Sequence, residues 1–314
     1  MKAWLFTGAR QPFQLIARHA PRPGPSEVLL QVRASGLCHS DVGRMDGTLT
    51  PFMPKKPPII LGHEIAGVVT EIGAAVTDYA IGDRVVASGT QEFCPGRNVD
   101  GGYATHCLLP THCLLRLPDT VSFVQGAAAT DAGQTSHHAI VVSGELRAAQ
   151  RIGIVGLGGL GMTGARIAVL NGAEVYGAEP RKEAWTAAKK QGVRSLVEDV
   201  LDLAPFELDL IVDFAGFGET TSGAISAVRP GGLVVQVGLG RTHAMISTME
   251  LIGKGVTLRG SGGGQPKDTA AVLGYMGKGE LAIEVTTIAF SEIPEGLKRL
   301  EQGSVIGRLV AEFN

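Results

Sequence analysis

Hydrophobic positions in the first 120 residues occur in short runs that are separated by turns rich in proline and glycine. Runs that alternate with polar residues or are rich in β-branched side chains cover residues 27–34, 65–72 and 84–87. Such runs, about four to eight residues long and bounded by Gly and Pro, are typical of β-strands. Ser35-Gly36 is expected to turn the chain towards Cys38. The pattern predicts a region built from strands.

From Arg151 the pattern changes to strands that alternate with helices. Strands are predicted at residues 152–155, 174–178, 209–214, 233–237 and 256–259, and helices at 160–171 and 181–191. Gly172 and Gly192 follow the two helices, where glycine commonly ends a helix. This alternation predicts a parallel, doubly wound sheet. After Gly279 isolated strands return around one helix, so we expect this tail to complete the first region.

The chain has 314 residues, which is longer than one ordinary domain, and 44% of them are hydrophobic, ample for two cores. The formal net charge is −2 with no basic tract, so nothing indicates a nucleic-acid partner. No apolar run approaches the roughly 18 residues that cross a bilayer, and the N-terminus lacks a signal-peptide pattern, so we expect no membrane partner. Without disulfide-type cysteine spacing, the simplest prediction is a reduced, cytoplasmic protein.

A glycine-rich motif follows the strand predicted at 152–155 and opens the next helix. It reads Gly156-Leu157-Gly158-Gly159-Leu160-Gly161. In a dinucleotide-binding turn the first glycine permits a tight turn, and the second lets a pyrophosphate approach the N–H groups of the helix N-terminus. The third lets the helix pack on the strand. A glycine-rich turn that binds no ligand could have the same residues, so a second sequence feature is needed to indicate dinucleotide binding.

That second feature is an acidic residue at the end of the following strand. Glu179 lies about twenty residues after the motif, where a carboxylate can accept hydrogen bonds from the adenosine ribose. The same carboxylate would repel a 2′-phosphate, which favours NAD over NADP. Arg181 and Lys182 follow at once and could offset that repulsion, so NADP remains the less favoured alternative.

Two loops of the β-rich region carry residues suited to a metal: Cys38-His39-Ser40-Asp41, and the His63-Glu64 pair between glycines. Zinc takes thiolate, imidazole and carboxylate ligands, and a catalytic zinc keeps one position open. A lone cysteine is more often a buried hydrophobe than a ligand, but here Cys38 and His63 occur with the rest of the motif. The third ligand is best sought at Asp131. Its alternative role is a helix N-cap, because residues 134–142 have a helical pattern.

Together these motifs resemble the zinc-dependent alcohol dehydrogenases of the medium-chain dehydrogenase/reductase superfamily, over essentially the whole chain. The resemblance implies an α/β fold with two domains. A GroES-like, β-rich catalytic domain would cover residues 1–140 and 281–314, and an NAD-binding Rossmann domain residues 141–280. It also implies a small-molecule alcohol or carbonyl substrate and a homodimer or homotetramer.

The resemblance suggests catalytic roles for single residues. Ser40 matches the first member of a proton relay. Glu64 matches a residue beside the metal or an exchangeable ligand. Many relatives carry a histidine five residues after the cysteine, where this chain has Gly43, so the relay is expected to continue through the ribose and solvent, or through His39. His39 also matches a position that contacts the pyrophosphate.

Further positions match residues that hold the cofactor or orient a ligand. Thr135 and Leu160 match positions that flank the nicotinamide, and Arg308 matches a pyrophosphate contact, for which a guanidinium is suited. Asp41 is expected to orient His63 through the ring nitrogen that does not bind the metal.

One stretch departs from the family pattern. Many relatives carry four closely spaced cysteines for a structural zinc where residues 88–103 of this chain hold only Cys94. One thiolate cannot fill a four-coordinate site. Cys107 and Cys113 fall in predicted strands and are expected to be buried thiols. We therefore expect one catalytic zinc per chain and no structural zinc.

The prediction is an NAD(P)-dependent zinc alcohol dehydrogenase that interconverts a primary or secondary alcohol and its aldehyde or ketone. A polyol or sugar dehydrogenase of the same superfamily is the first alternative. A zinc-free quinone or enoyl reductase and a non-catalytic nucleotide-binding protein are the others. The complete Gly62-His63-Glu64 motif argues against the zinc-free reductase, and the intact set of Cys38, His63 and Asp131 argues against the non-catalytic protein.

Overall fold

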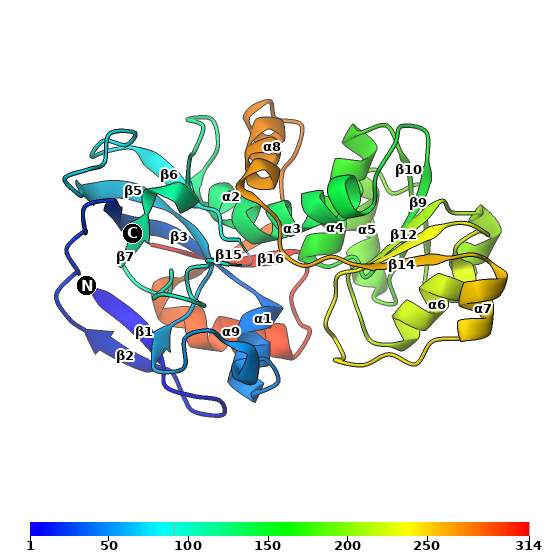
Figure 1. Ribbon diagram of the computed structural model, residues 1–314, viewed down its shortest axis with the longest axis horizontal. Helices are drawn as coiled ribbons and strands as arrows, with labels where there is room; N and C mark the ends of the chain where they lie inside the picture. Colours follow the sequence, from blue (N-terminus) through cyan, green and yellow to red (C-terminus); the bar gives the residue numbers. More distant parts are fainter. Residues whose placement is uncertain (91, 314) are drawn as a thin grey trace. The chain divides into compact units, whose positions relative to one another are not determined.

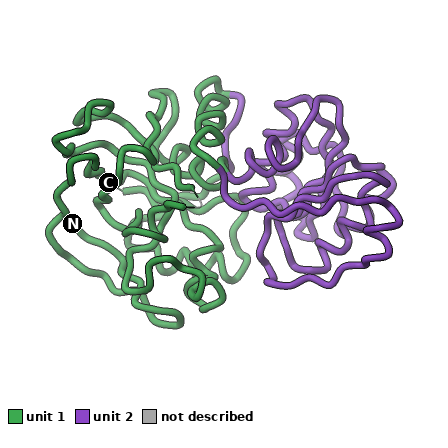
Figure 2. The backbone as a smooth tube through the Cα atoms, in the orientation of Figure 1, with its two compact units in different colours: residues 1–134, 265–279, 285–314 green, residues 135–264, 280–284 purple. Residues whose placement is uncertain are grey.

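The computed structural model describes residues 1–90 and 92–313, so Gln91, which lies in the stretch predicted to lack the structural zinc, and Asn314 lie outside the described residues. Two compact units divide the chain (Figure 2). Unit 1 contains Met1–Gln134, Gln265–Gly279 and Val285–Asn314, and unit 2 contains Thr135–Gly264 and Glu280–Glu284. Unit 2 is therefore an insertion in the sequence of unit 1.

These units differ from the expected domains at three places. Residues 135–140 belong to unit 2, residues 265–279 belong to unit 1, and residues 281–284 belong to unit 2. The second difference has a packing reason. Helix α8 (Pro266–Gly277) follows the last parallel strand in sequence, so the alternating pattern includes it, but it packs on the helical turn η3 (Ala129–Gly133) of unit 1.

Unit 1 is mostly β-structure (Figure 1). Its largest sheet has the order β15-β16-β3-β5-β6-β8, with β7 also paired to β3, and a smaller sheet has the order β2-β1-β4. The strands are β1 (Lys2–Phe6), β2 (Gln14–Ala17), β3 (Glu27–Leu37), β4 (Ile59–Ile60), β5 (Glu64–Ile72), β6 (Arg84–Ala87), β7 (His106–Pro110), β8 (Leu114–Arg116), β15 (Val285–Ala289) and β16 (Arg308–Glu312). Apolar side chains from both sheets form one buried core, including Phe6, Leu30 and Ile65.

Helices complete unit 1 at the ends and faces of these strands. They are α1 (His39–Asp46), α2 (Phe123–Ala128), α8 and α9 (Ile293–Glu301), with short turns η1 (Thr50–Phe52), η2 (Thr111–Cys113) and η7 (Phe290–Glu292). Helix α2 continues through η3, α3 (Gln134–His137) and η4 (His138–Ser143), so residues 123–143 form one helical segment with two π-helical turns.

Unit 2 is a single sheet with helices on both faces (Figure 1). All six strands are parallel, in the order β11-β10-β9-β12-β13-β14, which is the dinucleotide-binding order 3-2-1-4-5-6. The strands are β9 (Arg151–Val155), β10 (Glu174–Ala178), β11 (Ser195–Val197), β12 (Leu210–Asp213), β13 (Leu233–Gln236) and β14 (Thr257–Gly260). The strand expected at 256–259 is thus an edge strand of the sheet.

The helices that connect these strands lie on both faces of the sheet (Figure 1). Helix α4 (Gly159–Leu170) packs on β9 and β10 and contacts α5 (Trp185–Lys190), while α6 (Glu219–Ala227) packs on β12 and β13 and contacts α7 (Thr248–Gly253). Two short turns, η5 (Lys182–Ala184) and η6 (Val200–Phe206), complete the unit. The α/β fold predicted from the sequence, with a β-rich region and a doubly wound parallel sheet, is confirmed.

The turn predicted at Ser35-Gly36 was wrong, and the alternative role of Asp131 as a helix N-cap is excluded. Ser35-Gly36 does not turn the chain, because both residues remain in strand β3, which pairs on both sides and ends only at Leu37. Asp131 is not a helix N-cap, because the helix already begins at Phe123, where Ser122 accepts the capping hydrogen bond from Gln125 N–H. Among the described residues, no helix combines the length and apolar character needed to cross a bilayer.

Candidate active site

The C-terminal end of β3 and the N-terminal ends of β5 and β16 lie side by side at one edge of the large sheet. Strand β3 ends one residue before Cys38, β5 begins at Glu64, and β16 begins at Arg308. The antiparallel register pairs Gly36 with Glu64 and Leu37 with Leu309. Residues that are far apart in sequence are therefore neighbours at this edge.

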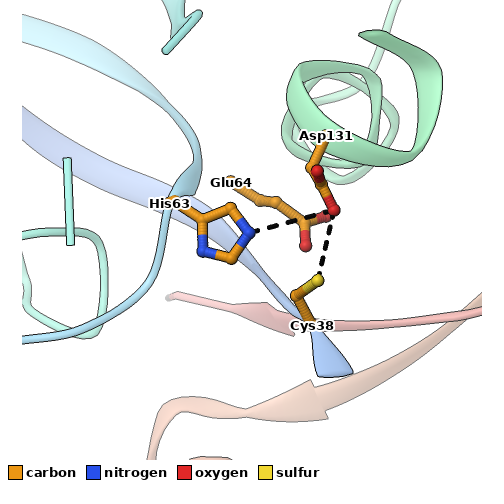
Figure 3. Close-up of side chains that lie close together, drawn as sticks. All are labelled: Cys38, His63, Glu64 and Asp131. Carbon is orange, nitrogen blue, oxygen red and sulfur yellow. Dashed lines mark hydrogen bonds and ion pairs between the residues drawn. The ribbon is translucent and has the colours of Figure 1, made fainter. Parts of the chain in front are cut away.

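The fourth side chain at this edge is Asp131, which comes from the π-helical turn η3. Turns of this kind are rare in proteins as a whole, but those that occur often lie at functional sites. Figure 3 shows the side chains of Cys38, His63, Glu64 and Asp131 directed towards one another. One donor atom from each lies within 4.8 Å of the others. The structure thus brings together the three predicted metal ligands and Glu64.

The spacing of the three predicted ligands suits a tetrahedral metal. Cys38 Sγ lies 3.3 Å and His63 Nε2 lies 3.8 Å from Asp131 Oδ2 (Figure 3). Donor atoms at ordinary zinc bond lengths on a tetrahedron are separated by about 3.4 to 3.6 Å. Two anions, a thiolate and a carboxylate, would balance the charge of Zn²⁺, and the imidazole is neutral when it binds a metal. The donor set therefore fits zinc.

Cys38 occupies the N-cap position of helix α1. Its Sγ accepts a hydrogen bond from Ser40 N at 3.5 Å, and the side chain is half-buried. Cys38 Sγ is therefore held at the N-terminus of α1, close to the other three donor atoms.

A buried carboxylate stands behind His63. Asp41 Oδ1 lies 3.6 Å from His63 Nδ1, an ion-pair distance that is longer than a normal hydrogen bond. Burial raises the pKa of Asp41, but the positive charges of His63 and Arg44 outweigh it and lower the pKa to about 2. Burial also lowers the pKa of His63, which Asp41 and Asp131 raise well above its usual value. The ionised Asp41 favours a proton on Nδ1, which leaves Nε2 for the metal.

Two further side chains hold Asp41, and the sequence analysis did not identify either of them. Arg44 Nη1 donates to Oδ1 at 2.5 Å, and Tyr103 Oη donates to Oδ2 at 2.8 Å. Arg44 is 6% exposed, and Tyr103 and Asp41 are fully buried. Arg44 could have been found from its position three residues after Asp41, had the helix at 39–46 been predicted. Tyr103 lies 62 residues away, and no local signal points to it.

Glu64 and Arg308 form a buried ion pair. Arg308 Nε donates to Glu64 Oε2 at 3.0 Å, and Nη2 donates both to Glu64 Oε1 and to Asp131 Oδ2. Burial raises the pKa of Glu64 to about 7, helped by Asp131 and opposed by Arg308. Burial lowers the pKa of Arg308, but the neighbouring carboxylates of Glu64 and Asp131 raise it well above its usual value, so its charge is retained. The guanidinium predicted to contact the pyrophosphate is 4% exposed and bound to carboxylates, and its contact with a cofactor remains a prediction.

The predicted relay residues lie on helix α1. Ser40 Oγ is 3.5 Å from His63 Nε2, on the side of the ring where the ligands meet. His39 is the exposed first residue of the helix. A Cβ at Gly43 would lie 2.8 Å from Leu49 Cδ1, so the side chain of Leu49 fills the space that a relay histidine would need.

The stretch at residues 88–103, described apart from Gln91, packs against the residues that lead into His63. The N–H groups of Gly101 and Gly102 donate to Ile60 O and Gly62 O at 2.8 and 2.7 Å. A Cβ at Gly101 would lie 2.1 Å from Gly62 O, so this close packing requires glycine. Cys94 is half-buried, whereas Cys107 and Cys113 are buried and burial raises the pKa of both thiols.

The glycine motif of unit 2 has the geometry of a dinucleotide turn. Gly156 has φ +81°, and a Cβ at Gly161 would lie 2.0 Å from Gly156 O. At Gly158, the N-cap of α4, no protein atom lies within 4 Å of such a Cβ, so the backbone there is open to a ligand. Helix α4 begins at Gly159. Tight turn, open approach and close packing thus occur at the first, second and third glycines, as the fingerprint requires.

Glu179 follows strand β10, and neighbouring groups already occupy its carboxylate. Leu157 N–H donates to Oε2 at 2.9 Å, while Arg181 donates to Oε1 from its backbone N at 3.1 Å and its Nε at 2.9 Å. Glu179 is 3% exposed. Trp185 Nε1 donates to the backbone oxygen of Glu179 at 2.8 Å. The carboxylate beside the predicted ribose site is therefore neutralised by Arg181.

The residue that follows Thr135 contacts Leu160, and both Thr135 and Leu160 are predicted to flank the nicotinamide. Ser136, which follows Thr135, donates from its Oγ to Leu160 O at 2.8 Å. Thr135 is buried and Leu160, in the first turn of α4, is half-buried. Both are parts of unit 2, beside the glycine motif.

Comparisons with known proteins agree with this geometry. The model of the alcohol dehydrogenase GroES-like domain matches residues 24–119, and that of the zinc-binding dehydrogenase matches residues 159–278. An alcohol dehydrogenase from Geobacillus stearothermophilus is 30% identical over 339 residues, with 100% of this chain and 99% of the relative covered. A probable D-xylulose reductase A from Neosartorya fischeri is 27% identical, with 91% and 90% covered.

A solved structure is also similar to this chain over nearly its full length. Acetophenone reductase from Geotrichum candidum NBRC 4597 in complex with NAD has a TM-score of 0.91 and 30% sequence identity. The match covers 99% of this chain and 96% of that chain.

Proposed function

Because the chain belongs to the zinc-type alcohol dehydrogenases of the medium-chain dehydrogenase/reductase superfamily, we propose that it interconverts a primary or secondary alcohol and its aldehyde or ketone with one catalytic zinc and NAD. The observation that carries the proposal is the meeting of Cys38 Sγ, His63 Nε2 and Asp131 Oδ2 at tetrahedral spacing. Bound zinc would polarise the substrate oxygen as a Lewis acid, and the nicotinamide would exchange a hydride with the substrate carbon.

The surrounding side chains would prepare this site. Asp41, held by Arg44 and Tyr103, keeps the proton of His63 on Nδ1. Ser40 Oγ would take the hydroxyl proton of the alcohol during oxidation and return it during reduction, since it lies 3.5 Å from His63 Nε2. Beyond Ser40, the proton would pass through the ribose and solvent or through His39, because Gly43 supplies no side chain.

The cofactor would bind to unit 2. Gly156, Gly158, Gly159 and Gly161 would bring the pyrophosphate to the N-terminus of α4, with Thr135 and Leu160 beside the nicotinamide and Glu179 and Arg181 beside the adenosine ribose. NAD is the proposed cofactor, and the NAD complex of the similar acetophenone reductase supports it. NADP is the less favoured alternative.

We also propose that the enzyme works in the cytoplasm as a homodimer or homotetramer, and that its catalytic and NAD-binding domains correspond broadly to the expected boundaries at residues 140 and 281. The similarity to a probable D-xylulose reductase supports a second candidate substrate class, polyols or sugars. A panel of simple secondary alcohols and of polyols, each assayed with NAD, separates the two.

The test of the metal site is the zinc content of protein purified without chelator. We expect about one zinc per chain, a loss of that zinc in Cys38→Ser, and its retention in Cys94→Ser, which replaces a thiol outside the proposed ligand set. Both variants remove one sulfur from unit 1, so they are matched for thiol loss. A zinc content near zero in the unaltered protein would contradict the mechanism, and a content near two would contradict the single site.

A further inference from the structure

Glu64 differs from the other donors around the candidate metal centre. Its carboxylate belongs to the set of atoms within 4.8 Å of one another, so it is near enough to become a ligand. Arg308 Nη2 also donates to Asp131 Oδ2, but only Glu64 has both of its oxygens in hydrogen bonds to that guanidinium. Such bidentate pairs fix direction as well as distance, because the two N–H groups and the two oxygens must face each other.

Strand β3 provides the space in which this pair lies. Strands β5 and β16 pair with opposite edges of β3, so Glu64 and Arg308 approach each other across it. Gly36 is the β3 residue opposite Glu64, and a Cβ there would lie 2.2 Å from Glu64 Oε2. The carboxylate therefore rests against a position where only glycine leaves room, and it is directed at Arg308.

The alternative for Glu64 is the metal itself. Glu64 is fully buried, and a buried carboxylate that loses its cation is strongly destabilised. With Arg308 removed, the nearest positive charge would be a metal bound by Cys38, His63 and Asp131. A fourth protein ligand would close the site, since open catalytic zinc sites have three protein ligands and structural sites have four.

We propose that Arg308 is a positioning residue that holds Glu64 away from the metal and so keeps the fourth coordination position open for the substrate. The inference rests on the proposed function, because it needs a metal at Cys38, His63 and Asp131. It gives Arg308 a role within unit 1, in addition to the pyrophosphate contact expected from the family resemblance. It also gives Gly36 a role, as the position that accommodates the carboxylate.

The experiment uses the full-length protein with cobalt(II) in place of zinc, and imidazole as a probe ligand that binds an open position on the metal. The change in the visible absorption of cobalt measures imidazole binding without catalysis. We expect Arg308→Met to retain cobalt but to bind imidazole more weakly. If Glu64 fills the fourth position about nine-tenths of the time, the apparent affinity falls about tenfold. The double variant Arg308→Met/Glu64→Gln should recover the original affinity, because the neutral amide is a poor ligand.

Two further variants guard against a trivial loss of structure. Gly36→Ala leaves Arg308 in place but displaces the carboxylate, so it should also weaken imidazole binding. Arg84→Met removes another arginine of the same sheet, whose guanidinium contacts Pro118 O and Val121 O away from the cluster, and it should leave imidazole binding unchanged.

The outcomes separate this inference from the proposed function. If cobalt-loaded Arg308→Met binds imidazole as the original protein does, or if the double variant binds as weakly as Arg308→Met, the positioning role is overturned and the zinc enzyme stands. If the original protein takes up neither zinc nor cobalt, both proposals are overturned.

Discussion

Replacing Tyr103 by phenylalanine removes one hydroxyl group from the core of unit 1 and little else. The hydroxyl donates to Asp41 Oδ2 at 2.8 Å, and both residues are fully buried. The ring, which packs edge-on against Phe13 with centroids 6.5 Å apart, would stay. The variant therefore isolates a hydrogen bond to an ionised acceptor in a fully buried site.

The size of the effect follows from what Asp41 retains. A hydrogen bond to a charged group contributes about 1.5 to 3 kcal/mol, and a buried acceptor that loses its donor is left unsatisfied. Asp41 still accepts the 2.5 Å hydrogen bond from Arg44 on Oδ1, so it loses only one of its two hydrogen-bond donors. We expect the free energy of unfolding to fall by about 2 kcal/mol. A less firmly held Asp41 should also lower zinc affinity by about tenfold, because it orients His63.

The assay is urea unfolding of metal-free protein, followed by zinc titration against a competing chelator. Tyr79→Phe is the matched control, since Tyr79 Oη donates to Leu114 O at 2.7 Å, a neutral acceptor in the same unit. That control should lose only about 1 kcal/mol and no zinc affinity. Equal losses in the two variants would refute the view that Asp41 is ionised and held by Tyr103.

Three other predictions concern the cofactor turn and the acid stability. Arg181→Leu should weaken NADPH binding about tenfold relative to NADH binding, because Arg181 neutralises Glu179. Fluorescence titration measures the affinity for each cofactor. Equal changes in the two affinities would contradict the role of Arg181 in offsetting the charge of Glu179. Gly161→Ala should cost about 1 to 3 kcal/mol of stability, whereas Gly158→Ala should keep stability and lose NADH affinity, as thermal melting and titration would show. In metal-free protein the pKa of Asp41 is lowered from 3.8 to about 2, which stabilises the fold by about 2 kcal/mol above pH 4. This stabilisation is lost as the pH falls towards 2. Urea unfolding as a function of pH should therefore show a smaller decline in stability for Asp41→Asn than for the original protein.

Local patterns predicted the elements of unit 2 well because each element is encoded by a short run of residues. The strand expected at 174–178 has those bounds in β10, and the three glycines of the motif lie where the turn needs them. Unit 1 was predicted less completely. Helix α1 was missed because its eight residues contain a glycine and few apolar positions, and its start depends on the capping by Cys38.

For the metal centre, sequence motifs predicted the ligand residues but not that these residues meet in space. Cys38, His63 and Asp131 could be nominated because thiolate, imidazole and carboxylate are the donors that zinc accepts. Their meeting could not be derived locally, because 93 residues separate Cys38 from Asp131. The prediction of a turn at Ser35-Gly36 was wrong for a related reason: Gly36 serves packing against Glu64 in a strand, and its sequence signal is the same as that of a turn.

The sequence by itself determined the α/β class, the insertion of a Rossmann sheet into a β-rich chain and the types of residue available for a zinc and a nicotinamide cofactor. These features depend on periodicity and on donor chemistry, which neighbouring residues express. Only the tertiary structure decided that Arg44 and Tyr103 hold Asp41, and that Arg308 pairs with Glu64, 244 residues away. Buried charges need partners, and strand register brings those partners together over distances that no sequence pattern spans.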